Sequence, residues 1–196
     1  MIPISRLWAL LAVLFLFLSV SACKEDETPE GVNPAEGSYF SIRQYAQDQW
    51  NTFRGEPFLI LKTVRVNKGK YDSSYTNSDT LDWGGILQKF FATEISDPSF
   101  LGKYKFTQFN DEQDDSHNYF YEALEDDLYT RKLLISVSQE TNVAQGIYIE
   151  AIDKAPLEER MVKLYYKPMK RIQIQEIVTP LFGEKTHTVT EYEFER

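Results

Sequence analysis

The spacing of apolar and polar positions changes along the chain. Two stretches between about Phe40 and Ile95 repeat apolar side chains every three to four residues, which is the period of a helix that buries one face. From Tyr104 onward apolar and polar residues alternate, which is typical of strands with one buried and one solvated face. The pattern therefore predicts two helices near the start of the domain and an antiparallel sheet after them.

The first helix is expected from Phe40 to Arg54. Gly55 favours the left-handed backbone that ends a helix, and Pro57 stops the helix from resuming. Two strand-like runs follow, at 58–66 and 71–76. The polar residues between them include a glycine, so these two runs are expected to form a hairpin.

The second helix is expected from Leu81 to Ile95, where the large apolar residues fall on one face. Asp79 or Thr80 is placed to cap its first turn. The Gly84-Gly85 pair weakens that turn by roughly 1 kcal/mol per glycine relative to alanine.

Further strands are expected in the second half of the chain, joined by short connections that suit a meander of hairpins. Two helices cannot cover both faces of so many strands. We therefore predict an α+β domain with two N-terminal helices followed by a curved, mainly antiparallel β-meander. The alternative is a closed β-barrel with the helices outside. The expected strands are 104–109, 118–124, 129–138, 146–152, 161–166, 171–178 and 188–194.

Composition narrows the class of protein. A hydrophobic fraction of 42% and an aromatic fraction of 14% are those of a folded chain. The chain holds 21 Lys and Arg against 30 Asp and Glu, a net charge of −9. Such an acidic surface repels phosphate backbones, so nucleic acid is not an expected partner.

An uncharged apolar run from Leu7 to Val20 follows Arg6 at the start of the chain. Fourteen residues make a helix of about 21 Å, which is shorter than the ~30 Å core of a bilayer. The run therefore favours a secretory signal peptide over residues 1–22. The alternative is an uncleaved membrane anchor.

The segment Val20-Ser21-Ala22-Cys23 resembles a lipobox, the motif at which bacterial lipoprotein precursors are cleaved and lipidated. Cys23 is the single cysteine of the chain, so no intramolecular disulfide is possible. The resemblance implies that Cys23 becomes the mature N-terminus and carries a diacylglycerol thioether. Two or more acyl chains anchor a protein stably where one does not. The membrane, reached through covalent lipid, is thus an expected partner.

An acidic tract follows Cys23 directly and resembles the surface-export signal of Bacteroidota lipoproteins. The resemblance implies an outer-membrane protein that faces outward, and the alternatives are a solvated acidic leader and a periplasm-facing domain. The tract comprises Lys24, Glu25, Asp26 and Glu27. Prolines and glycines up to Gly37 then indicate a tether. We expect a signal peptide at 1–22, the lipidated cysteine and tether at 23–37, and one globular domain at 38–196.

The sequence shows no constellation typical of catalysis, and no catalytic residue, metal ligand or cofactor is assigned. His117 and His187 lie outside any nucleophile motif. The acidic residues at 111–115 have oxygen ligands suited to calcium, but their spacing lacks the glycine of a calcium loop, so a solvated hairpin turn is the preferred interpretation.

Aromatic residues on the predicted strands are the remaining candidates for a binding site. Tyr119-Phe120-Tyr121 and Tyr165-Tyr166 place rings on both faces of their strands, and outward rings can stack on ligands or anchor partners. The candidate binding residues are Tyr119, Tyr121 and Tyr165, and the competing interpretation is that both faces are buried. Trp50 and Trp83 lie on the helical stripes and are expected in the core.

The preferred hypothesis is a membrane-anchored, surface-exposed lipoprotein with a non-catalytic domain that binds a small ligand or an outer-membrane protein complex. One alternative is a hydrolase that uses Asp or Glu residues brought together by folding. The other is an accessory protein of envelope assembly.

Overall fold

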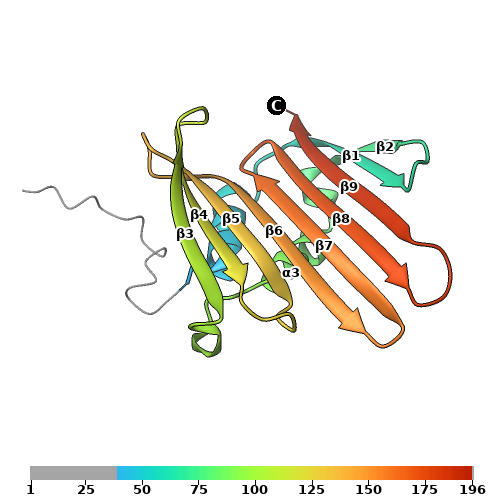
Figure 1. The fold of residues 1–196 in the computed structure, drawn as a ribbon. Helices are drawn as coiled ribbons and strands as arrows, with labels where there is room; N and C mark the ends of the chain where they lie inside the picture. The colour runs from blue at the N-terminus through green and yellow to red at the C-terminus, as the bar shows by residue number, and fades with distance from the viewer. Residues whose placement is uncertain (1–38, 196) are drawn as a thin grey trace, which may run out of the picture.

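The computed structural model describes residues 39–195 (Figure 1). The predicted signal peptide (1–22), Cys23, the tract at 24–27 and the rest of the tether lie outside these residues. The described elements are α2 (Ile42–Phe53), β1 (Leu59–Val66), β2 (Asp72–Asn77), a 3-10 turn η2 (Ser78–Thr80), α3 (Trp83–Phe91), a 3-10 turn η3 (Pro98–Phe100), β3 (Tyr104–Asp111), β4 (Ser116–Ala123), β5 (Thr130–Ser138), β6 (Ala144–Ala155), β7 (Glu158–Lys167), β8 (Arg171–Pro180) and β9 (Thr186–Glu195).

All nine described strands form one antiparallel sheet in the order β2-β1-β9-β8-β7-β6-β5-β4-β3. Strands β3 to β9 are the predicted meander, and the β1–β2 hairpin joins it beside the last strand, with Ile60 opposite Phe194. The sheet is open, with β2 and β3 at its edges, so the closed-barrel alternative was wrong. The sheet does not need to close into a barrel to bury its apolar face, because the two helices cover that face.

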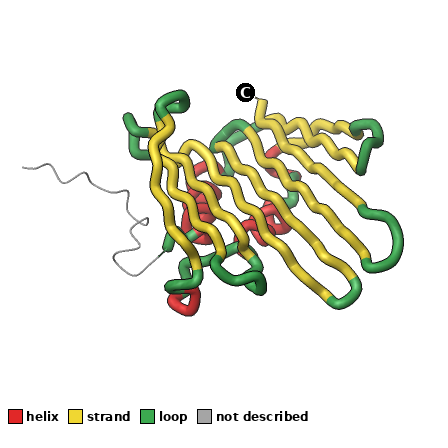
Figure 2. Tube along the Cα trace, in the orientation of Figure 1, coloured by secondary structure: helices red, strands yellow, loops and turns green. Residues whose placement is uncertain are grey.

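Both helices lie on the same face of the sheet (Figure 2). Alternation along the strands directs the apolar side chains toward the helices. The deeply buried aliphatic ones include Leu133, Ile135, Ile147, Ile149 and Leu164. A fully buried side chain of this size contributes roughly 1.5–3 kcal/mol. The opposite face is partly solvated and carries polar pairs, such as Lys163 and Glu150 on adjacent strands at 3.2 Å.

The first helix begins and ends close to the expected positions. Ser41 caps α2 by accepting a hydrogen bond from the backbone N–H of Gln44. Gly55 follows the helix with a φ of +87°, which confirms it as the terminating residue.

The cap of the second helix differs from the prediction. Asp82, rather than Asp79 or Thr80, accepts a hydrogen bond of 2.9 Å from the backbone N–H of Gly85. Asp79 and Thr80 instead form part of the 3-10 turn η2, which the sequence pattern did not predict. A Cβ at Gly85 would lie 2.4 Å from the Asp82 carboxylate, so the glycine that weakens the helix also makes room for its cap.

Glu94 joins the end of α3 to the start of α2. One carboxylate oxygen accepts from the Ser41 hydroxyl at 3.0 Å and the Arg43 N–H at 2.6 Å. The other accepts from the backbone N–H groups of Ile95 and Ser96, at 3.0 and 2.8 Å. Burial alone raises the pKa of Glu94, but the hydrogen bonds from Ser96, Arg43 and Ser41 outweigh it and hold the pKa below its usual range. α3 itself ends at Phe91, four residues before the predicted boundary at Ile95.

We expect Glu94→Gln to lower the free energy of unfolding by about 1–3 kcal/mol, because an amide cannot accept hydrogen bonds on both terminal atoms. The folded-state pKa of Glu94 lies below its unfolded value, so its contribution is complete above about pH 4.5 and is lost as the pH falls through the folded pKa. In urea unfolding, the difference between the two proteins should therefore shrink in acid. Glu112→Gln, in the exposed β3–β4 turn, is the matched control and should change stability by less than about 0.5 kcal/mol. A Glu94→Gln effect that is independent of pH would contradict the assignment.

Candidate functional site

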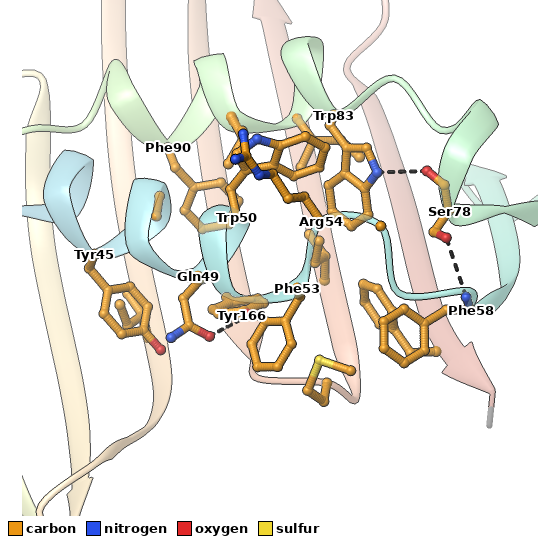
Figure 3. Close-up of a pocket in the computed structure, with 18 of the residues that line it drawn as sticks. Tyr45, Gln49, Trp50, Phe53, Arg54, Phe58, Ser78, Trp83, Phe90 and Tyr166 are labelled. Carbon is orange, nitrogen blue, oxygen red and sulfur yellow. Dashed lines mark hydrogen bonds between the residues drawn. The ribbon is translucent and has the colours of Figure 1, made fainter.

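A pocket of about 140 Å³ lies between the two helices and the centre of the sheet (Figure 3). Side chains of α2 and α3 line the pocket on its helix side, and residues of β6, β7, β8 and β9 line it on its sheet side. The connection from Arg54 to Phe58 borders it at one side. Its lining is mainly apolar and rich in rings, which are those of Tyr45, Trp50, Phe53, Phe58, Trp83, Phe90, Tyr166 and Phe194.

One wall of the pocket is a continuous set of ring contacts. The Trp50 and Trp83 rings, one from each helix, have centroids 5.3 Å apart. Trp83 stacks on Phe194 of β9 at 6.1 Å, and Phe58 meets Phe194 edge-on at 6.0 Å. Such pairs contribute about 0.5–1.5 kcal/mol beyond the area that they bury. The wall is therefore held in place by the helices and the sheet together.

Ser78 fixes the position of this wall. It is 8% exposed, and its carbonyl oxygen accepts a hydrogen bond of 2.8 Å from the Trp83 indole N–H. Its hydroxyl donates to the Glu56 carbonyl at 2.8 Å and accepts from the Phe58 N–H at 3.3 Å. The indole and the connection after α2 are thus tied to the same residue.

The other wall offers uncharged polar groups. The Tyr166 hydroxyl donates a hydrogen bond of 2.9 Å to the side-chain oxygen of Gln49. The Tyr45 ring lies 6.1 Å from that of Tyr166, and within residues 39–195 its buried hydroxyl has no hydrogen-bond partner. Burial raises the pKa of both tyrosines, and for Tyr45 the neighbouring Tyr166 adds to the rise. Both phenols are therefore neutral at physiological pH.

Arg54 and Asp79 add charge where the lining is exposed to solvent. These two side chains have opposite signs, so they do not give the pocket a net charge. The interior thus combines apolar ring surface with neutral phenol and amide groups. This chemistry suits binding of an apolar or weakly polar group.

The two tryptophans were expected in the core, yet both are half-buried and face the pocket. The helical stripes correctly indicated that these rings point toward the sheet. What the stripes did not reveal is the space left between them, because that depends on Tyr166 and Phe194, which come from distant strands.

The expectation of outward rings on β4 was wrong for Tyr119 and Tyr121. They are 2% and 0% exposed and belong to the core. Tyr39 meets Tyr121 edge-on at 5.5 Å, and Phe106 of the edge strand covers it at 5.0 Å. Phe120 takes the other face. Tyr165 is half-exposed on the face without helices, opposite Tyr148, and so lies apart from the pocket.

The two histidines and the acidic turn do not come together. His117 pairs with Asn110 and His187 with Gln175, on strands β4 and β9 that are separated by four others. Asp111 accepts backbone hydrogen bonds within the β3–β4 turn, which is a solvated hairpin as preferred. In the described part of the chain, no three or more His, Cys, Asp or Glu residues gather in a way that suits a metal ion.

Comparison of the chain with protein-family models, with curated proteins and with solved structures finds no match in any of the three. Among residues 39–195, neither helix has the length and hydropathy needed to cross a bilayer.

A double-mutant cycle tests the polar wall. We expect Gln49→Leu to destabilise the protein by about 1–3 kcal/mol, because it leaves the Tyr166 hydroxyl without its acceptor. Combining it with Tyr166→Phe should cost less than the sum of the two single changes, by about 0.5–1.5 kcal/mol. Tyr71→Phe removes a hydroxyl from a side chain that is 62% exposed, and it should leave stability within about 0.5 kcal/mol. Strictly additive effects for Gln49 and Tyr166 would rule out their coupling.

Proposed function

We propose that this protein is a lipid-anchored outer-membrane lipoprotein whose domain binds a small ligand in the aromatic pocket. The observation that carries the binding proposal is the ring-lined space of about 140 Å³ between α2, α3 and the sheet. Concave sites with mostly apolar walls and a few placed polar groups are the usual setting of small-molecule binding. The pocket has this composition, and rigid elements hold its rings from both sides.

The size and chemistry of the pocket define the class of ligand. A dry apolar cavity of about 150 Å³ accommodates one benzene ring. The pocket therefore suits a single ring or a short branched hydrocarbon group. Gln49 and Tyr166 give the lining neutral amide and phenol groups, which are hydrogen-bonded to each other. A neutral ligand is favoured over a charged one, since burying an uncompensated charge is costly.

The anchor proposal is supported by the sequence at the start of the chain. Cys23 follows an apolar run and small residues, and Lys24, Glu25, Asp26 and Glu27 follow the cysteine. Attachment by lipid also suits the net charge of −9, which disfavours electrostatic adhesion to anionic headgroups. On this proposal the domain stays at the outer membrane and faces outward, where a ligand reaches the pocket directly.

Intrinsic fluorescence can test ligand binding without a label. Two of the three tryptophans line the pocket, and the third, Trp8, lies in the proposed signal peptide. We expect 4-bromobenzyl alcohol, a single ring with a neutral hydroxyl and a heavy atom, to quench this fluorescence saturably. Phe53→Ala should weaken binding about fivefold to tenfold, because it removes one ring contact of about 1–1.4 kcal/mol.

Phe109→Ala is the matched control for that experiment, because Phe109 lies on the edge strand β3 outside the pocket lining. Its quenching curve should coincide with that of the unaltered protein. Linear quenching without saturation, or equal weakening by both variants, would contradict a ligand site in the pocket.

Mass spectrometry tests the anchor separately. We expect the purified protein to begin at Cys23 and to carry the added mass of a diacylglycerol and an acyl chain. Cys23→Ser should lose both modifications and the attachment that depends on them. Protease treatment of intact cells should degrade the anchored domain if it faces outward. An unmodified thiol would refute the anchor, and a protected domain would refute outward display.

A further inference from the structure

Exposed apolar side chains gather at one end of the sheet. The described residues include twelve large apolar side chains that are exposed, and eight of them lie at the end where β2, β3, β5, β7 and β9 begin. The eight are Val66, Tyr71, Leu101, Leu124, Tyr129, Leu157, Leu181 and Phe182. This end runs along the lower and right-hand margin of the sheet in Figure 1. Isolated exposed apolar residues are ordinary, but their concentration on one set of turns is not.

Four of these residues lie in the β4–β5, β6–β7 and β8–β9 turns, which follow one another along this end of the sheet. Leu124 follows β4 and is 62% exposed, and Leu157 lies between β6 and β7 and is 70% exposed. Leu181 and Phe182, between β8 and β9, are 63% and 84% exposed. The backbone N–H of Leu181 donates to the Leu157 carbonyl at 2.8 Å, so two of these turns adjoin. We call Leu124, Leu157, Leu181 and Phe182 the apolar rim.

The opposite end of the sheet exposes fewer large apolar side chains. Its β3–β4 turn carries Glu112, Asp114 and Asp115, and the β5–β6 turn at 139–143 has Val143 as its exposed apolar residue. Charge does not separate the two ends, because Glu125, Asp126 and Asp127 follow Leu124 in the β4–β5 turn, and Lys167 and Lys170 lie at the opposite end. The two ends differ in the apolar side chains that they expose to a membrane surface.

The described chain also begins at the apolar end. The Tyr39 hydroxyl accepts from the Gly102 N–H at 3.0 Å, just before β3 begins, and Figure 1 shows the first described residues beside that end of β3. Fifteen residues separate Cys23 from Tyr39, and they span at most about 54 Å when fully extended. A lipid on Cys23 therefore keeps the domain within reach of the bilayer and raises the effective concentration of the apolar end there.

We infer that the apolar rim lies against the lipid surface to which Cys23 is attached, with its side chains among the headgroups and upper acyl carbons. The inference rests on the proposed lipid anchor. The anchor supplies proximity, and the rim supplies orientation. In this orientation the β3–β4 and β5–β6 turns of the opposite end face away from the membrane.

Depth-dependent quenching tests the orientation. The lipidated full-length protein is reconstituted into phosphatidylcholine vesicles that contain a brominated phosphatidylcholine. Phe182→Trp places a fluorophore on the rim, and Val143→Trp places one at a site of 58% exposure on the opposite end. Trp50 and Trp83 give the same background in both variants. We expect the added fluorescence of Phe182→Trp to be quenched at least twofold more than that of Val143→Trp.

Flotation of the vesicles separates failure of this inference from failure of the anchor. Protein that floats with the vesicles but shows equal quenching in the two variants overturns the membrane-facing rim and leaves the anchor intact. Equal quenching together with cross-links through position 182 between copies would assign the rim to a second copy of this chain, and would also overturn the inference. Protein that fails to float, with an unmodified Cys23, overturns the anchor and with it the inference.

Discussion

The Glu94 carboxylate holds two helices together above a sheet that neither could cover alone. Its four hydrogen bonds come from the Ser41 hydroxyl, the Arg43 N–H at the start of α2, and the two backbone N–H groups that follow its own residue. A negative charge at that position also complements the positive end of the α2 dipole. Because the pocket is the space between these helices and the strands beneath them, its shape depends on this connection together with the contact between Trp50 and Trp83.

The helices cover only one face of the sheet, and this gives the two faces different roles. The covered face supplies the apolar core and the ring-lined space. The other face is a ladder of polar and amphipathic side chains, in which Glu150 lies between Tyr148 and Lys163. Such pairs contribute little to stability when they are solvated. The face covered by the helices thus supplies most of the stabilising burial and also the proposed binding site.

Periodicity predicted the two helices and the nine strands, because alternation along β5 and the stripe on α2 are physical requirements of one-sided burial. Gly55 likewise ends α2 for a reason visible in the sequence. Periodicity did not predict η2 or the Asp82 cap of α3. The position of the β1–β2 hairpin was beyond such reasoning, since pairing between Ile60 and Phe194 joins residues from opposite ends of the domain. The burial of Tyr119 and Tyr121 depends on Tyr39 and Phe106, and the pocket depends on Tyr166 and Phe194, so each required the tertiary arrangement.

The pairing of β1 with β9 has a consequence for the order of folding. Paired residues of β1 and β9 are separated by more than 120 residues of chain, so their pairing closes a long loop and forms only after β9 is available. Chains with many contacts between distant residues fold slowly. The hairpin β1–β2 has β9 as its neighbour in the sheet, so it cannot dock until the C-terminal residues have emerged. The sheet is therefore incomplete until its last strand has been synthesised.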